Sequence, residues 1–196
     1  MHDLTEGVTR FRRDVYPAKA ELFAHLAATH RPTTLFISCS DARVVPELIT
    51  QSEPGELFVI RTAGNLVPAR TAGPDGVAAS IEYAVAVLGV TDIVVCGHSA
   101  CGAMTALAER HDLSAAPAIA DWLRHAAPGS GARQADVDAL IRENVLAQLA
   151  NLATHPAVTR ALAAEAVTLH AWVYDIPTGT VEELSTAAAR RPVLAV

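Results

Sequence analysis

The chain has 196 residues, 51% of them hydrophobic and 18% charged, with a formal net charge of −6 at pH 7. This length suits one domain with a sizeable core, and the composition argues against a disordered chain. The acidic balance argues against nucleic acid as a partner, because a phosphate backbone attracts clustered Lys and Arg. We find no membrane-spanning stretch and no secretory leader, so we expect a cytoplasmic protein whose three cysteines are reduced.

The predicted elements begin with a helical arm over residues 1–30, in two pieces, the second starting at Pro17. Apolar runs rich in β-branched residues then predict strands, at 34–39, 57–61, 92–97 and 167–174. Apolar residues at helical spacing predict helical segments, at 46–49, 76–88, 102–110, 115–126, 134–153 and from Pro156 onward. Asp75 or Gly76 would cap the helix at 76–88, and Thr154 would cap the last helix.

Strands that alternate with helices predict an α/β fold, with a mostly parallel sheet and helices on both faces. The last strand leads through Pro177 and Gly179 to Val181, which predicts an edge hairpin near the C-terminus. We expect a single α/β domain over residues 31–196, with the arm of residues 1–30 as part of the same domain. Ligands of such sheets bind beyond the carboxyl ends of the strands.

Two cysteines and a histidine stand at the ends of two predicted strands. Cys39 ends the first strand, and His98 and Cys101 follow the third in an H-x2-C spacing. Two sulfurs and one nitrogen are three of the four ligands of a tetrahedral zinc, and an open fourth position distinguishes a catalytic site from a structural one. Taken singly, a free cysteine is more often a small buried hydrophobe, and Cys96, inside its strand, is interpreted as core.

Asp41 and Arg43 lie two residues apart on the turn just after Cys39. Burying these groups and His98 unpaired would be costly, which favours the metal interpretation of the cysteines. A bidentate pair with Arg43 would hold the Asp41 carboxylate rigid and ionised. Asp41 would then accept a hydrogen bond from a zinc-bound hydroxide and orient it. The alternative is a salt bridge that only fixes the turn.

Six segments stand out together: Cys39–Val44, Pro54–Arg61, Ala79–Tyr83, Gly97–Gly102, Glu143–Val145 and Trp172–Asp175. Through these segments the chain resembles the β-class carbonic anhydrases, from Pro32 to about Leu184. The resemblance implies reversible hydration of carbon dioxide to bicarbonate and a proton, by attack of zinc-bound hydroxide, with one Zn2+ per chain. It assigns three zinc ligands and a catalytic Asp–Arg pair, which fall on Cys39, His98, Cys101, Asp41 and Arg43.

The resemblance also implies a substrate pocket and an oligomer. The pocket is partly contributed across a dimer interface and falls on Phe58, Ala63, Tyr83 and Gly102. The helical arm of such proteins embraces a neighbouring subunit, so we expect residues 1–30 to form a dimer contact. The expected partners are carbon dioxide, bicarbonate and further copies of the chain, in a homodimer or a dimer of dimers, with no nucleic acid and no membrane.

Two positions bear on how the site works. His30 stands where many relatives have a Gln that donates a hydrogen bond to the substrate. It would donate likewise, shuttle protons, or be an exposed helix end. Some relatives close the site by moving the residue that matches Asp41 onto zinc as a fourth ligand. Those relatives have an aromatic residue, often Trp, at the position of Phe36, and their bicarbonate pocket matches Arg61 and Tyr174. Phe36 favours the open form.

Two other functions stay open on the sequence. Close relatives hydrolyse carbonyl sulfide or carbon disulfide with the same ligands, and the motifs do not separate these substrates from carbon dioxide. A non-catalytic zinc module would have a filled fourth ligand position and no turnover. The Asp41–Arg43 pair argues against that module, because a purely structural zinc site needs no such pair.

Overall fold

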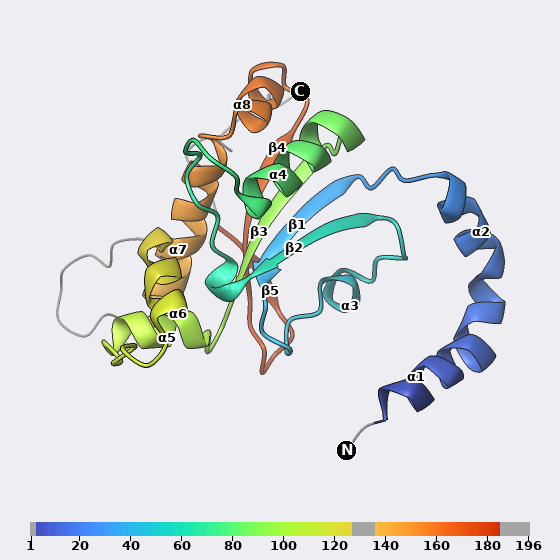
Figure 1. Cartoon of the computed structure of the whole chain (residues 1–196), viewed down its shortest axis with the longest axis horizontal. Coiled ribbons are helices and arrows are strands. Elements are labelled where there is room, and N and C mark those ends of the chain that lie inside the picture. Colours follow the sequence, from blue (N-terminus) through green and yellow to red (C-terminus); the bar gives the residue numbers. More distant parts are fainter. Residues whose placement is uncertain (1–2, 127–135, 185–196) are drawn as a thin grey trace, which may run out of the picture. The chain divides into compact units, whose positions relative to one another are not determined.

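The computed structural model of the chain describes residues 3–126 and 136–184 (Figure 1). The chain divides between Arg31 and Pro32 into two compact units. The larger unit contains the whole sheet and all the residues expected to bind metal. Among the described residues, no helix is both long enough and apolar enough to span a bilayer.

The N-terminal unit is a chain of helical turns, as predicted. Its elements are α1 (Leu4–Arg10), a π-helical turn η1 (Phe11–Val15), a 3-10 turn η2 (Tyr16–Lys19) and α2 (Ala20–Ala28). Pro17 does not begin α2 but lies in the 3-10 turn, where its missing N–H interrupts the α-helical ladder. The Tyr16 ring stacks on Phe23 with 5.5 Å between ring centroids, while Leu4 and Val8 are 82% and 59% exposed.

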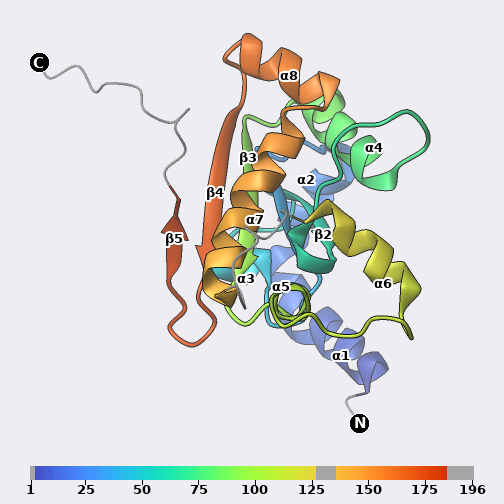
Figure 2. The ribbon, with the colours of Figure 1, turned by 90° about the vertical axis from the view of Figure 1, so that its left-hand side faces the viewer.

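The larger unit is built on a five-stranded sheet in the order β2-β1-β3-β4-β5. The strands are β1 (Thr34–Cys39), β2 (Leu57–Thr62), β3 (Asp92–His98), β4 (Thr168–Tyr174) and β5 (Val181–Glu183). The first four are parallel, and β5 pairs antiparallel with β4 at the edge (Figure 2). The predictions of an α/β fold, a mostly parallel sheet and a C-terminal edge hairpin are confirmed.

Helices lie on both faces of this sheet. One face packs its alternate strand residues, such as Leu35, Ile37 and Val95, against three helical segments. These segments are α4 (Gly76–Glu82) with its π-helical extension η4 (Tyr83–Leu88), α7 (Val137–Leu152) and α8 (Pro156–Ala163). The opposite face carries a smaller cluster around Phe36, and the short α3 (Pro46–Thr50) lies on that side, sharing a pocket with Trp172.

A glycine in β3 sets how closely α7 approaches the sheet. A Cβ on Gly97 would stand 2.7 Å from Val145 Cγ2 and 3.2 Å from Ile141 Cγ2. Real side-chain carbons do not pack at the first of these distances, so the helix can rest directly on β3 only where the strand has no side chain. Because Gly97 immediately precedes His98, this contact also fixes the end of β3 where the candidate metal ligand stands.

The helix boundaries depart from the prediction at several ends. Asp75 caps α4 through its carboxylate, which accepts the Val77 N–H. Thr154 does not cap α8: the N-cap is His155, and the Thr154 hydroxyl instead donates to Asn151 O and accepts the Arg70 N–H. The helix expected at 115–126 is α6 (Pro117–Trp122) followed by a 3-10 turn η5 (Leu123–His125). The expected start of α7 at 134 lies outside the described residues.

Candidate metal centre

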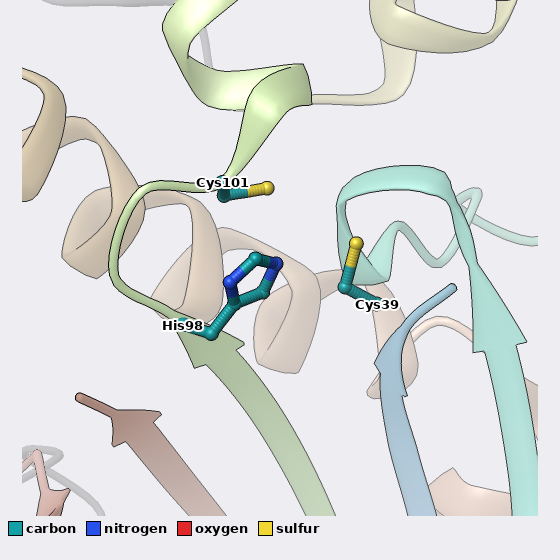
Figure 3. Close-up of side chains that lie close together, drawn as sticks. All are labelled: Cys39, His98 and Cys101. Atoms are coloured by element: carbon teal, nitrogen blue, oxygen red, sulfur yellow. The ribbon is translucent and has the colours of Figure 1, made fainter. Parts of the chain in front are cut away.

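Three buried ligand atoms converge at the carboxyl edge of the sheet. Cys39 is the last residue of β1, and His98 is the last residue of the neighbouring parallel strand β3. Cys101 is the N-cap residue of α5 (Gly102–Ala108). A ring nitrogen of His98 and the two Sγ atoms lie within 4.8 Å of one another, and the three side chains point toward a common centre (Figure 3).

The His98 ring has one nitrogen committed and one available. Nδ1 lies 2.9 Å from Ser99 O, and because a carbonyl only accepts, Nδ1 carries the proton. Nε2 therefore presents a lone pair, and it is fully buried with no hydrogen-bond partner among the described residues. A buried polar atom without a partner is rare, and a metal-bound His typically donates its other N–H to such a carbonyl. The histidine therefore fits a metal ion.

Backbone N–H groups near each sulfur favour its thiolate form. Those of Asp41 and Gly64 lower the pKa of Cys39, and those of Ala103 and Met104, in the first turn of α5, act against the rise in the pKa of Cys101. The Cys101 thiol is the largest cause that lowers the pKa of Cys39, to about 4; the His98 ring and the two amides lower it further, and burial opposes them. The same contact with Cys39, followed by burial, raises the pKa of Cys101. A metal ion binds cysteines as thiolates, so a divalent ion held by both sulfurs would displace any thiol proton between them.

The turn after β1 carries the bidentate ion pair expected from the sequence. Arg43 Nε donates to Asp41 Oδ1 at 2.9 Å, and Arg43 Nη2 donates to Oδ2 at 2.7 Å. The Arg43 guanidinium therefore holds the pKa of the Asp41 carboxyl well below its usual range. Asp41 Oδ2 lies 3.9 Å from His98 Nε2. An ionised carboxylate, held by the Arg43 guanidinium, thus lies at the edge of the buried Cys–His–Cys cluster.

Two further contacts hold this pair in place. Arg43 Nη2 also donates to Ala100 O at 3.0 Å, and Ala100 has a φ of 53°, in the left-handed region. This strained turn connects His98 to Cys101 and directs its carbonyl at the guanidinium. Arg61 of β2 donates to the carbonyl oxygens of Cys39, Asp41 and Val44 at 3.1, 2.6 and 2.8 Å. No sequence pattern predicted the strain at Ala100, and the resemblance assigned Arg61 only to a bicarbonate pocket.

The expected substrate residues do not all lie at this centre. Ala63 begins a 3-10 turn beside β1, and Gly102 is the first residue of α5, so both lie near the cysteines. Phe58 pairs with Leu35, four residues before Cys39, which is roughly 13 Å along the strand at the usual rise. Its ring lies 6.0 Å from that of Tyr83, which is 43% exposed. Within one chain, the aromatic pair is therefore remote from the ligands.

Three other residues singled out in the sequence have surroundings of their own kind. His30 is exposed and belongs to the N-terminal unit, after the end of α2. Phe36 is fully buried on the face opposite α7, with its ring edge-on to Trp172 at a centroid distance of 6.0 Å. Tyr174 packs against the same cluster and pairs with His98 across the sheet.

An α/β sheet that ends in buried Cys, His and Cys ligands beside an Asp–Arg pair defines a candidate metalloenzyme. The sequence profile described as carbonic anhydrase matches residues 34–181. A carbonic anhydrase of Pseudomonas aeruginosa is 56% identical over 198 residues, covering 97% of this chain and 90% of its own length. The chain belongs to the β-carbonic anhydrase family of enzymes.

Solved structures agree with this assignment. The β-carbonic anhydrase CcaA superposes with a TM-score of 0.86 at 40% identity, covering 93% of each chain. A structure described among two tetrameric β-carbonic anhydrases of Sordaria macrospora superposes with a TM-score of 0.80 at 28% identity. The match covers 93% of this chain and 95% of that one. The likeness extends over almost the whole chain and not only over the ligand segments.

Proposed function

We propose that the chain binds one Zn2+ through Cys39, His98 and Cys101 and catalyses the reversible hydration of carbon dioxide to bicarbonate and a proton. The observation that carries the proposal is the Asp41 carboxylate, fixed by two hydrogen bonds from Arg43 and only 3.9 Å from the unpartnered His98 Nε2. A zinc site with a purely structural role has no use for an ionised carboxylate held at its rim.

Zinc, when bound, would supply the Lewis acidity that makes water nucleophilic near neutral pH, as it does in carbonic anhydrases with three His ligands. The chain's own groups would do the rest. Asp41 would accept the hydrogen bond of the attacking oxygen and direct its lone pair at the carbon of the substrate. Arg43 would keep that carboxylate ionised and in place. The water proton leaves as the second product, and the new C–O bond gives bicarbonate.

The arrangement of Asp41 supports an open site. In a closed site, Asp41 would leave Arg43 and become the fourth metal ligand. Here both carboxylate oxygens are engaged by the guanidinium, at 2.9 and 2.7 Å, and Oδ1 also accepts the Arg43 backbone N–H at 2.9 Å. Releasing Asp41 would break three hydrogen bonds, so we propose that the fourth position is left to water and substrate.

The remaining assignments extend this proposal. We propose that Phe58, Ala63, Tyr83 and Gly102 bind the small apolar substrate, with the aromatic pair supplied by a second subunit, and that His30 donates a hydrogen bond or relays a proton. The exposed apolar residues Leu4 and Val8 support a dimer contact for the arm of residues 1–30. Tetrameric relatives support a homodimer or a dimer of dimers.

We also propose that residues 31–196 form a single zinc-binding α/β domain. The ligand thiols must stay reduced, so we propose a cytoplasmic location for the protein.

Carbonyl sulfide and carbon disulfide are the alternative substrates, since both are small, linear and open to the same attack. A direct comparison tests the choice. Zinc-loaded protein is supplied with carbon dioxide, carbonyl sulfide or carbon disulfide, and proton release and hydrogen sulfide are followed in parallel. Rapid proton release from carbon dioxide with little sulfide from the other two supports the proposal. The reverse ranking would assign the site to a hydrolase of the sulfur compounds.

A further inference from the structure

A short turn next to the candidate metal centre is held in place by side chains from other helices. The 3-10 turn η3 (Ala63–Asn65) follows β2 and contacts β1, β3 and α5. Its central residue, Gly64, has a φ of +70°, and a Cβ there would stand 3.0 Å from Ala103 Cβ. The Gly64 N–H faces Cys39 and favours its thiolate form, because it lowers the pKa of that thiol. The turn therefore fits tightly between one candidate ligand and the helix that begins directly after the other, Cys101.

Two side chains from outside this turn bind its carbonyl groups. Trp122, at the end of α6, donates from Nε1 to Ala63 O at 2.9 Å. Asn144 of α7 is fully buried and donates from Nδ2 to Gly64 O at 3.1 Å. Gln148, one turn along α7, donates to Asn144 Oδ1 at 2.9 Å and so fixes the orientation of the Asn144 amide.

The geometry of one peptide group connects Trp122 to the sulfur. The carbonyl of Ala63 and the N–H of Gly64 belong to the same planar trans peptide, so they point in opposite directions. Fixing the carbonyl on the indole N–H therefore aims the N–H at Cys39 Sγ. A hydrogen bond on the carbonyl also polarises the amide and strengthens its own donation. Asn144 holds the carbonyl of Gly64, in the next peptide plane, and so restrains the turn on the other side of the Gly64 Cα.

We propose that Trp122 and Asn144 are positioning residues of the metal centre, which fix the Ala63–Gly64 peptide so that its N–H donates to the Cys39 thiolate. This inference rests on the zinc site proposed above. An N–H donor on a ligating thiolate reduces the charge that the sulfur gives to the metal, and it holds the sulfur in place. Groups that support metal ligands in this way typically change metal affinity about 10- to 100-fold when removed.

A purely structural role makes a different prediction, and the chain offers a control for it. The segment after the turn is buried, and its backbone groups need partners whether or not a metal binds. Asn151 meets that need on the same helix: its Nδ2 donates to Val67 O at 2.8 Å and to Gln148 Oε1 at 3.2 Å. Gln148 keeps its bonds to the Val67 N–H and to Asn144 Oδ1 when Asn151 is replaced, so the support of Asn144 is retained. The bond to Val67 O resembles that of Asn144, but it engages a carbonyl three residues farther along the chain from Gly64.

The test compares Trp122→Phe, Asn144→Ala and the control Asn151→Ala in the full chain. Each protein is loaded with Co2+ to record the thiolate-to-metal charge-transfer band, and with Zn2+ to measure metal release to a chelator. We expect Trp122→Phe and Asn144→Ala to shift the band and to release zinc about 10-fold faster or more. Asn151→Ala should lower the melting temperature yet keep the parent band and release rate.

The outcomes distinguish a failure of the positioning role of Trp122 and Asn144 from a failure of the zinc site. A parent band and release rate in Trp122→Phe would overturn the inference, even if Asn144→Ala fails to fold, because the phenyl ring keeps most of the packing and removes only the donor. Equal shifts in Asn151→Ala would also overturn it, since general loosening would then explain the effect. A parent protein that binds neither metal ion would refute the zinc site itself.

Discussion

Adding one methyl group at Gly97 should destabilise the fold by an amount that the packing allows us to work out. The new Cβ of Gly97→Ala would meet Val145 Cγ2 at 2.7 Å and Ile141 Cγ2 at 3.2 Å. Both partners are buried, at 0% and 2% exposure, and branch at Cβ, so neither can swing aside. Either α7 shifts away from β3 or the side chains leave their preferred rotamers. Such overpacking costs about 1–3 kcal/mol.

A double-mutant cycle tests the cause of this loss. Val145→Ala removes the methyl group that causes the closest contact, so Gly97→Ala should cost less in that background, with a coupling of about 0.5–3 kcal/mol. Urea unfolding of the four proteins, all measured with the same excess of zinc, gives the free energies of unfolding. A Gly97→Ala protein as stable as the parent, or two losses that simply add, would refute the packing argument.

Three other substitutions test the site and its surroundings. Cys39→Ser should lose zinc and hydration activity together, measured by metal analysis and assay of the same sample, whereas retained activity without zinc would contradict the ligand assignment. Asp41→Asn should keep zinc but turn over about 10- to 100-fold more slowly; unchanged turnover would remove Asp41 from the mechanism. His170 lies between Asp92 Oδ1 at 3.1 Å and Glu183 Oε1 at 2.8 Å. Burial lowers the pKa of His170, but the two carboxylates outweigh it and raise the net value. The resulting stability is full below the unfolded pKa and disappears as pH rises through the folded pKa. Thermal melts should therefore show His170→Gln less stable than the parent at pH 6 and similar at pH 9, and an equal deficit at both would argue against the ion pairs.

The fold was predictable where the signals are local. Apolar runs located β1 and β3, and parallel pairing then placed Cys39 and His98 at one edge of the sheet. The cap of α8 was not predictable, because Thr154 is drawn into a contact with the N–H of Arg70, which is distant in sequence. Propensity describes a residue and its neighbours, and it cannot anticipate which remote backbone group will compete for a hydroxyl.

The same distinction holds at the site. The bidentate contact between Asp41 and Arg43 spans two residues and follows from their spacing. By contrast, Arg61 reaches the loop after β1 only because β2 pairs beside β1, and Trp122 reaches Ala63 across 59 positions. Ala100 has a positive φ although it is not glycine, asparagine or aspartate, the residue types that favour this conformation. Its residue type therefore does not predict a strained turn. These contacts and this backbone conformation form only when the chain is folded.

The most direct test of the account is stopped-flow hydration of carbon dioxide, with a pH indicator, on protein of measured zinc content. We predict one zinc per chain and fast turnover near neutral pH, lost when a chelator removes the metal and restored when zinc is added back. Turnover at neutral pH would also agree with an Asp41 that stays on Arg43. A protein with one zinc per chain and no hydration at any pH would contradict the proposed function.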